Sequence, residues 1–427
     1  MTTVPSSPIR RFLPFILSAI ILLIGWGTHQ ALLWQQSATL PTPVLRRIPL
    51  GAEERNLARY AWRFFELNRQ PSGLVSSAAS FPATTMWDIG SQFAGMTAAR
   101  ELNLLSAEEF DRWMGQALTS LSKIQLYKNE LPNKAYNAAT LMPVNYGKLD
   151  AYQEIGFSAL DLGRLAMWLD LIAARYPQHT AATKAVSARW NLTRLSRQGQ
   201  LMGVDARSGK EDWQQEGRLG YEQYGAYGLA KLGLNVAVAL NPKTEMMTVD
   251  VMGVPVPVDR RTTYHNYVTS EPYILDGLES GFKALPAEFA ARVLQAQQRR
   301  YWATNQLTAW SEDNLDKAPW FVYNSIFVDG QPWKTLDPSG KDAAAFRGSS
   351  TKAAVGWHML FRTAYSDRVY KGLRWLADPE RGVFAGYYEE TQEPNRALTV
   401  NTNGIILEAL LYSHVGKPLE DWAHAPH

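Results

Sequence analysis

The sequence predicts an all-α domain in which six helical hairpins close into an (α/α)6 toroid, behind an N-terminal transmembrane anchor helix. Three observations support this fold class. Apolar residues recur at helical spacing from Gly51 to Val415. Helix starts return at intervals of roughly 50 to 80 residues, as in stacked helical units. A charge-free apolar run fills residues 12–34. The same hairpins could also form an open solenoid with a concave binding surface.

The N-terminal segments divide by charge and hydropathy. Arg10 and Arg11 precede the apolar run, so residues 1–11 are predicted to be cytoplasmic and residues 12–34 to span the inner membrane once. The C-terminal domain then faces the periplasm. A cleaved signal peptide is the alternative, but no clean small-x-small cleavage site follows. Residues 35–50 are a predicted linker, residues 51–416 the helical domain and residues 417–427 a tail.

Helices are predicted wherever apolar residues recur at three-and-four spacing. Ser106, Ser270 and Ser350 are candidate N-caps. A strand-like stretch at residues 247–258 contains Pro and Gly, and we expect a loop ribbon there. The predicted helices cover residues 53–68, 85–103, 107–126, 156–174, 180–197, 219–240, 271–282, 286–301, 351–363, 366–376 and 402–414.

Composition narrows the functional classes. A net charge of +3 with interleaved signs argues against nucleic acid as a partner. The chain has no cysteine, and its seven histidines show no metal-ligand spacing, so we expect no metal site. No cofactor is expected either, because no phosphate-binding loop follows a strand. The G-x-S-x-G elbow of serine hydrolases is also missing.

Polar residues gather at the predicted helix starts, which a closed ring would bring to one face. Ligand sites are concave and carry a few placed polar groups, so these residues are the candidate substrate-binding set. Aromatic rings are frequent, with 15 Trp and 19 Tyr, which fits either core packing or a sugar-binding cleft. Trp320 is a further candidate sugar platform. The candidate set is Trp87, Asp88, Asn133, Tyr136, Asp161, Tyr221, Glu271, Tyr273, Trp310, Asp316, Tyr387, Asn401 and Asn403.

Two carboxyls in different environments are needed for glycoside hydrolysis. Glu222 lies in a predicted first helical turn among Tyr221, Tyr224 and Tyr227, and aromatic surroundings raise a carboxyl pKa. We therefore expect Glu222 to be the general acid. Glu312 lies in a polar loop and is the expected nucleophile or base, with Asp313 as a substitute.

Five motifs resemble the DUF3131 family, in order and through nearly all of residues 51–415. That family resembles the six-hairpin glucoamylase-like superfamily. This resemblance implies an (α/α)6 toroid and a function in carbohydrate binding or metabolism, but it does not imply a particular reaction. The motifs are Met86-Trp87-Asp88-Ile89-Gly90-Ser91, Leu131-Pro132-Asn133-Lys134-Ala135-Tyr136-Asn137, Gly217-Arg218-Leu219-Gly220-Tyr221-Glu222-Gln223-Tyr224, Thr269-Ser270-Glu271-Pro272-Tyr273 and Asn401-Thr402-Asn403-Gly404.

A more distant resemblance is to the glycoamylase-like domain of cyclic β-1,2-glucan synthases and to β-1,2-glucanases. It rests on the order Glu222, then Glu271-Pro272-Tyr273, then Glu312 and Asp316. The resemblance implies Glu222 as the acid and Glu312 as the nucleophile or base.

Three functions remain open at this level. The first is a membrane-anchored periplasmic glycoside hydrolase or transglycosylase acting on a glucan or exopolysaccharide, with the polysaccharide biosynthesis machinery as a candidate partner. The second is a non-catalytic glycan-binding or exopolysaccharide secretion accessory protein on the same fold. The third is a polysaccharide lyase, for which Arg260, Arg261, Tyr264 and His265 form the candidate cluster.

Overall fold

The structure, a computed structural model, describes residues 39–426. The predicted cytoplasmic segment, the predicted anchor at residues 12–34 and the first residues of the predicted linker lie outside this range. Within the described range, no helix combines the length and hydropathy that crossing a bilayer requires. The compact body begins at Thr42.

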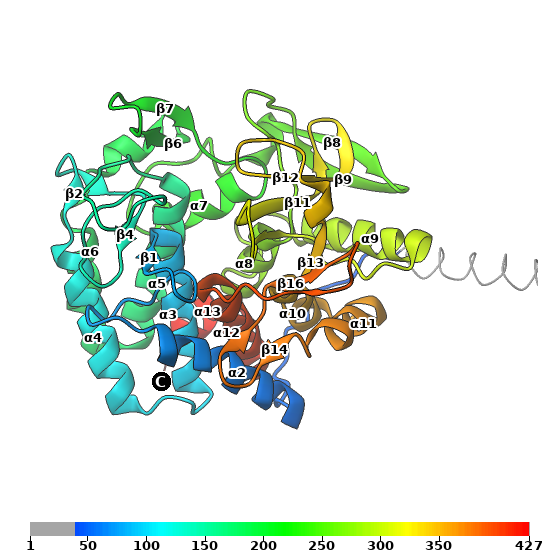
Figure 1. Ribbon diagram of the computed structural model, residues 1–427, viewed down its shortest axis with the longest axis horizontal. Coiled ribbons are helices and arrows are strands. Elements are labelled where there is room, and N and C mark those ends of the chain that lie inside the picture. The colour runs from blue at the N-terminus through cyan, green and yellow to red at the C-terminus, as the bar shows by residue number, and fades with distance from the viewer. Residues whose placement is uncertain (1–38, 427) are drawn as a thin grey trace, which may run out of the picture. The chain divides into compact units, whose positions relative to one another are not determined.

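Six inner helices form a closed ring. Each packs against the next one in the chain, and the last packs against the first, which confirms the predicted toroid. These helices are apolar nearly all round, as buried helices are; every residue of α10 is buried. In chain order they are α3 (Met86–Glu101), α5 (Ala159–Arg175), α7 (Tyr221–Ala230), α8 (Glu271–Glu279), α10 (Thr351–Phe361) and α12 (Val400–Val415), drawn in Figure 1.

The outer layer is less regular than predicted. In the described residues it contains α2 (Ala52–Asn68), α4 (Ala107–Lys123), α6 (Thr180–Ser187), α9 (Ala287–Thr304) and α11 (Ala364–Leu373). The helix expected at residues 180–197 ends early, and a short 3-10 turn, Leu192–Leu195, follows. The helix expected at residues 219–240 also ends early, at Ala230. Gly233 follows with φ +83°, a conformation that no helix contains.

A β-hairpin, β8 (Met246–Val251) and β9 (Val254–Asp259), occupies the stretch between α7 and α8. The prediction of a loop ribbon there is therefore wrong. Met252 and Gly253 form the turn with φ 57° and 77°, and positive φ at both central residues is the two-residue geometry that fits twisted strands. Pro255 and Pro257 are tolerated because this sheet has only two strands.

Short strands fill the connections between helices, so the prediction of an all-α domain is incomplete. Several of them lie at the upper end of the body in Figure 1, above the starts of the inner helices. The strands are β1 (Ala83–Thr84), β2 (Leu126–Tyr127), β3 (Leu131–Pro132), β4 (Tyr136–Asn137), β5 (Ser196–Arg197), β6 (Gln200–Asp205), β7 (Asp212–Gln215), β10 (Glu312–Asn314), β11 (Phe321–Val328), β12 (Gln331–Leu336), β13 (Gly348–Ser350), β14 (Ala377–Asp378), β15 (Gly382–Val383), β16 (Gly386–Tyr388) and β17 (Pro394–Asn395).

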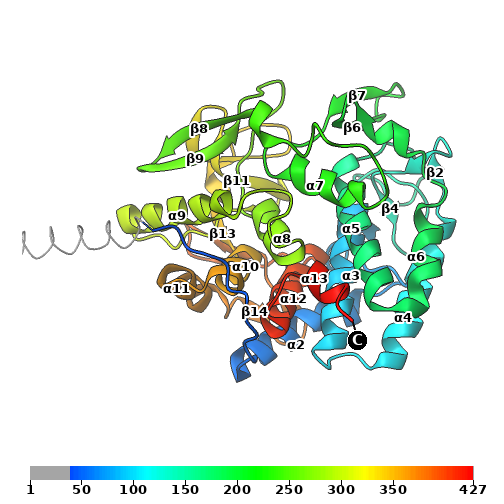
Figure 2. The same cartoon turned by 180° about the vertical axis from the view of Figure 1, so that it is seen from behind.

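The first and last segments of the compact body pack against its helices. In the predicted linker, the backbone N–H groups of Val44 and Ile48 donate to the carbonyls of Leu360 and Ser413. The predicted tail contains α13 (Leu419–Ala423), which Figure 2 shows beside α12. Glu420 of α13 forms an ion pair with Lys283 at 2.9 Å.

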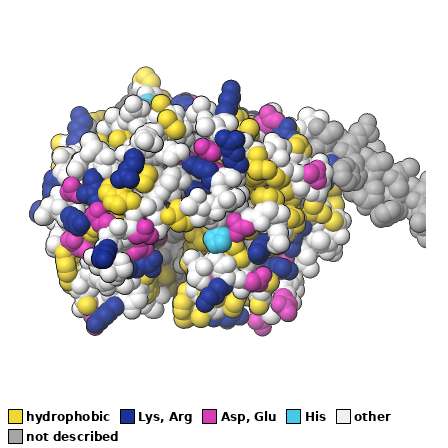
Figure 3. All heavy atoms as spheres, turned by 90° about the horizontal axis from the view of Figure 1, so that it is seen from above, with side chains coloured by type: hydrophobic (Ala, Val, Ile, Leu, Met, Phe, Trp, Pro, Cys, Tyr) yellow, Lys and Arg dark blue, Asp and Glu magenta, His cyan; other side chains and the backbone are white. Residues whose placement is uncertain are grey.

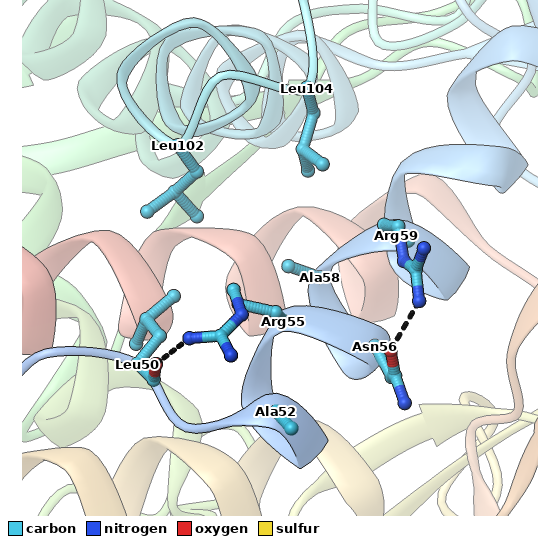
Figure 4. Close-up of a pocket in the computed structure, with 8 residues that line it drawn as sticks. All are labelled: Leu50, Ala52, Arg55, Asn56, Ala58, Arg59, Leu102 and Leu104. Carbon is cyan, nitrogen blue, oxygen red and sulfur yellow. Dashed lines mark hydrogen bonds between the residues drawn. The ribbon is translucent and has the colours of Figure 1, made fainter.

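A pocket of about 320 Å³ lies between α2 and the turn after α3 (Figure 4). Leu102 and Leu104 line it at the C-terminal end of α3. Since α3 has 16 residues, this pocket lies about 24 Å along the helix from its first turn. It is therefore remote from the helix starts. Its lining is Leu50, Ala52, Arg55, Asn56, Ala58, Arg59, Leu102 and Leu104.

Candidate functional site

The six inner helices begin at the same end of the ring, here called the N-terminal face. Side chains from the first turns of different helices contact one another there, as the following contacts show. Hydroxyl caps orient three of these starts: Thr85, Ser158 and Thr399 each accept a backbone N–H from the first turn. Figure 3 views the body from this side, where acidic and basic side chains lie among apolar ones.

Glu271, in the first turn of α8, is the centre of the contacts. Trp87 of α3 donates its indole N–H to Glu271 Oε1 at 3.0 Å. Asn401 of α12 donates its amide to both carboxylate oxygens, at 3.1 and 3.0 Å. Lys352 of α10 forms an ion pair with Oε2 at 2.6 Å. Only 2% of Glu271 is exposed, so these donors replace water around its carboxyl oxygens.

Lys352 joins this carboxylate to a second acidic pair. Its ammonium lies 3.3 Å from Asp313 Oδ1 and donates to the backbone carbonyl of Glu312 at 2.7 Å. Burial alone would lower the lysine pKa, but the charges of Glu271, Asp313 and Glu312 hold it well above the ordinary value. The lysine is therefore a buried cation shared between acidic groups.

Glu312 and Asp313 lie on the short strand β10. Burial raises the pKa of each carboxyl to about 7, and the charge of Lys352 opposes the shift. Glu312 Oε2 accepts the Ser311 hydroxyl at 2.8 Å, whereas Oε1 is buried without a partner. Tyr323 lies opposite Glu312 in the β10–β11 register. Glu312 is therefore suited to hold a proton near neutral pH.

Asp88 and Asp161 form the other side of the acidic group, in the first turns of α3 and α5. Burial raises their pKa values to about 6 and about 7, and they repel each other. One oxygen of Asp88 accepts from the Thr85 backbone and hydroxyl. Arg164, three residues after Asp161 on the same helix, forms ion pairs with Glu279 and Glu408.

Glu222 lies in the first turn of α7 but in a separate cluster. Its Oε2 accepts from Arg261 at 2.6 Å and its Oε1 from Gln215 at 2.9 Å. Burial raises the pKa of Glu222, while the Arg261 ion pair opposes the increase. Tyr221 lies beside Trp87, with ring centroids 6.0 Å apart, so the two clusters are neighbours.

Some predicted substrate residues are fully engaged in loop structure. Asn133 bonds to the backbone of Ala135 and Ile155, and Tyr136 donates to the Gln125 carbonyl. Asn403 ties α12 to both backbone groups of Val383.

The remaining predicted residues make other contacts or lie at the surface. Trp310 is completely buried and donates to Glu389 at 2.7 Å, and Tyr273 is buried as well. Tyr387 donates to the Leu307 carbonyl. Asp316 accepts from Tyr388 and Arg396, and Trp320 is 63% exposed.

Two functional contacts were missed by sequence reasoning. Lys352 could have been noticed, because a cation in a first helical turn opposes the helix dipole and therefore needs acidic partners. Glu216 precedes α7 in the chain yet caps α5, where its carboxylate accepts the Ala159 N–H at 2.6 Å and the Ser158 hydroxyl at 3.0 Å. No local sequence signal marks a cap supplied from so far along the chain.

Three members of the candidate lyase cluster have acidic partners. Arg260 pairs with Glu245, Arg261 pairs with Asp259 and Glu222, and His265 pairs with Asp329. Within residues 39–426, no group of three His, Asp or Glu side chains is arranged to hold a metal ion.

A closed ring of six inner helices, covered by outer helices and with acidic residues at one face, is an (α/α)6 toroid. The chain belongs to the DUF3131 family, described as a protein of unknown function, whose profile matches residues 56–416. No curated protein matches the chain.

Solved structures share this fold at low sequence identity. A candidate glucoamylase from Bacteroides caccae superposes with a TM-score of 0.63 at 12% identity, covering 87% of this chain and 95% of its own. An endo-β-1,2-glucanase from Chitinophaga pinensis, in complex with sophorotriose and glucose, gives 0.60 at 11%, covering 88% and 95%. An endo-β-1,2-glucanase from Talaromyces funiculosus, with sophorose, gives 0.59 at 11%, covering 87% and 85%.

Proposed function

We propose that this chain is a glycoside hydrolase acting on a β-linked glucan, with β-1,2-glucan as the first substrate to test. Two structures of the same fold are named endo-β-1,2-glucanases, which supports the substrate class. The observation that carries the proposal is the contrast between Glu271 and Glu312. The Glu271 carboxyl group is surrounded by hydrogen-bond donors, whereas Glu312 Oε1 is buried without a partner.

This contrast divides the roles of acid and base. Glu312 holds a proton and donates it to the glycosidic oxygen as the bond to the anomeric carbon breaks. Glu271 stays ionised, and either attacks the anomeric carbon or removes a proton from the incoming water. If a sugar hydroxyl replaces that water, the same pair carries out transglycosylation. Lys352 and Asn401 hold the Glu271 carboxyl group in place.

Glu222 as the acid remains a prediction from the sequence, and the geometry favours Glu312 for that role. Both Glu222 oxygens already accept hydrogen bonds, one of them from a guanidinium. In our proposal, Glu222 and Arg261 form a structural ion pair next to the site.

The location of the protein is part of the proposal. The apolar run at residues 12–34 behind Arg10 and Arg11 supports an inner-membrane anchor with the domain in the periplasm. There it would meet an exported glucan or exopolysaccharide, beside the polysaccharide biosynthesis machinery. Protection from added protease in intact cells, lost when the outer membrane is opened, tests this location; cleavage only after lysis of the inner membrane excludes it.

A non-catalytic glycan-binding protein is the second candidate. The observation that favours it is burial, since Glu271 and Glu312 are only 2% and 5% exposed. The experiment incubates the full-length chain with linear β-1,2-glucan and follows reducing ends and product length. New reducing ends and shorter chains support the hydrolase. Tight binding with unchanged chain length and no new reducing ends supports the binding protein and contradicts the hydrolase.

A further inference from the structure

Two arginines beside Glu222 have buried N–H groups without partners. They are Arg218 Nε and Arg261 Nη1. A buried donor without a partner costs about 1–3 kcal/mol, and more when the group is charged. Such donors call for an acceptor brought by a ligand or by water.

The two guanidiniums belong to one connected cluster. Arg218 donates to Gln215, Gln215 donates to Glu222 at 2.9 Å, and Arg261 donates to the same carboxylate at 2.6 Å. The backbone N–H of Leu219, next to Arg218, donates to Asp259, which also pairs with Arg261. The unpartnered donors therefore lie in the same neighbourhood.

The charges in this cluster are divided unequally. Both nearby carboxylates, Glu222 and Asp259, are ion-paired with Arg261, whereas Arg218 hydrogen-bonds only to the Gln215 amide oxygen and the Gly217 carbonyl. Arg218 is thus a cation without a carboxylate ion pair in the described residues, although only 6% of it is exposed. Burial and the neighbouring Arg261 lower its pKa, and the charges of Asp259 and Glu222 offset only part of that decrease. An added anion would relieve this repulsion.

The cluster reaches the surface beneath an aromatic ring. Arg218 Cζ lies 5.5 Å from the centroid of Tyr264, and Tyr264 is 41% exposed. An exposed ring beside a guanidinium suits a sugar that carries an anionic group, because the ring packs on the sugar while the guanidinium binds the anion.

We propose that Arg218, Arg261 and Tyr264 form a subsite for an anionic oxygen group on a sugar, such as a uronate carboxylate or a phosphate substituent. The proposal rests on the glycan-binding part of the proposed function and not on hydrolysis. It predicts that the natural glycan carries negative charge near the α7 end of the N-terminal face.

The test compares D-glucuronate with D-glucose by titrating each into the full-length chain and following ligand binding by NMR. Wild type should bind glucuronate about tenfold more tightly, since hydrogen bonds to charged groups are stronger than neutral ones. Arg218→Met should remove this preference, whereas Arg218→Lys should keep part of it. Arg260→Met is the matched control, because Arg260 is exposed and pairs with Glu245; it should keep the full preference.

Equal binding of the two sugars by wild type, or an unchanged preference in a folded Arg218→Met, would overturn the subsite. Competition by inorganic phosphate separates the two ligand sources. Tighter binding of phosphate than of glucuronate points to phosphate substituents, and weaker binding points to a uronate. Hydrolysis of neutral glucan without any glucuronate preference would defeat this inference alone. A preference for glucuronate over glucose without any hydrolysis would contradict only the proposed hydrolase function.

Discussion

Burial decides the chemistry of single residues at the N-terminal face. Glu271 and Lys352 are both nearly inaccessible, and a buried charge is tolerated only when it is paired and hydrogen-bonded. Both groups have such partners. Trp87, Asn401 and Lys352 contact the Glu271 carboxyl group. Asp313 and the Glu312 backbone carbonyl are the other partners of the Lys352 ammonium. The pair is therefore a fixed electrostatic unit rather than a surface ion pair.

Replacing Lys352 by Met should destabilise the fold and abolish hydrolysis. The substitution leaves two buried carboxylates without a cation, which costs about 3–5 kcal/mol. Urea unfolding followed by circular dichroism measures the change. Lys371→Met is the control, because that lysine forms an exposed i,i+4 pair with Asp367, and its effect should stay within about 0.5 kcal/mol. A loss below about 1 kcal/mol for Lys352→Met would contradict the shared-cation account.

The pH dependence of hydrolysis should report the proton on Glu312. Its pKa is raised to about 7, so the acid form is present below that pH and disappears above it. We expect kcat/KM to fall as pH rises through about 7. The same shift favours the folded state below the ordinary glutamate pKa, and this contribution is lost as pH rises toward 7.

Two other carboxyl groups could also cause the fall of kcat/KM above pH 7. Asp161 and Asp313 also have a pKa raised to about 7. An Asp161→Asn variant should keep the alkaline decline if Glu312 is the donor. Loss of the decline in this variant would move the assignment to Asp161.

The sequence identified several site residues but not their roles. Trp87, Glu271 and Asn401 were predicted from polar residues at helix starts, and they do contact one another. The role expected for Glu222 depended on Tyr221, Tyr224 and Tyr227, which are neighbours in sequence. Its ion pair with Arg261, 39 residues away, depends on the β8–β9 hairpin that precedes Arg261 and that sequence reasoning read as a loop.

At the scale of elements, glycine sets the distance between inner helices. A Cβ at Gly163 of α5 would lie 2.3 Å from the carbonyl oxygen of Gly225 in α7, and one at Gly228 would lie 1.9 Å from the Gly163 carbonyl. The two backbones therefore touch. This contact fixes α7, and with it Tyr221, against α5.

Gly163→Ala should separate α5 from α7 and destabilise the protein by about 1–3 kcal/mol, as overpacked cores do. Gly115→Ala is a matched control in the helix α4, where an added Cβ meets nothing within 4 Å. Alanine there should stabilise by about 0.5–1 kcal/mol. Thermal unfolding of both variants measures the difference. Equal melting temperatures would show that the close contact does not matter.

Helix starts were predicted better than helix ends. Ser106 caps α4 as expected and accepts the Glu109 N–H. Ser270 and Ser350 begin their helices without capping them; Ser270 bonds to the Trp310 carbonyl and Ser350 to Asp313. Local sequence marks where a helix can begin, but tertiary contacts decide which partner the serine hydroxyl takes.

At the scale of the whole molecule, a buried ionic network holds the ring closed. Arg164 of α5 reaches Glu279 of α8 at 2.9 Å and Glu408 of α12 at 3.2 Å, and all three side chains are fully buried. Neither α8 nor α12 is adjacent to α5 in the ring. Burial raises the pKa of Glu408 well above its ordinary value, so a proton balances the extra carboxyl. The network therefore joins α5 to two helices that are not its neighbours in the ring.

Arg164→Met should be among the most destabilising single changes, at about 3–5 kcal/mol, because two carboxyls lose their buried cation. Urea unfolding monitored by tryptophan fluorescence measures it. Arg112→Met is the control, since Arg112 forms an exposed pair with Glu109. A free energy of unfolding near that of wild type would mean that packing alone closes the ring.

The closed ring was predictable because helix starts recur along the sequence. The six inner helices begin at intervals of roughly 50 to 80 residues, although no long outer helix lies between α7 and α8. The meeting of Glu271, Lys352 and Glu312 was not predictable in the same way, because their distances depend on how tightly each pair of inner helices packs.

The most direct test of the central claim uses two substrates with each carboxyl variant. Linear β-1,2-glucan needs an acid to protonate its leaving oxygen, whereas a 2,4-dinitrophenyl β-sophoroside does not. Glu312→Gln should lose the first activity by about 100-fold or more and keep much of the second, while Glu271→Gln should lose both. Glu222→Gln should keep both where it remains folded. The account would be contradicted if Glu312→Gln still hydrolysed the glucan, while Glu222→Gln lost glucan hydrolysis and kept hydrolysis of the dinitrophenyl substrate.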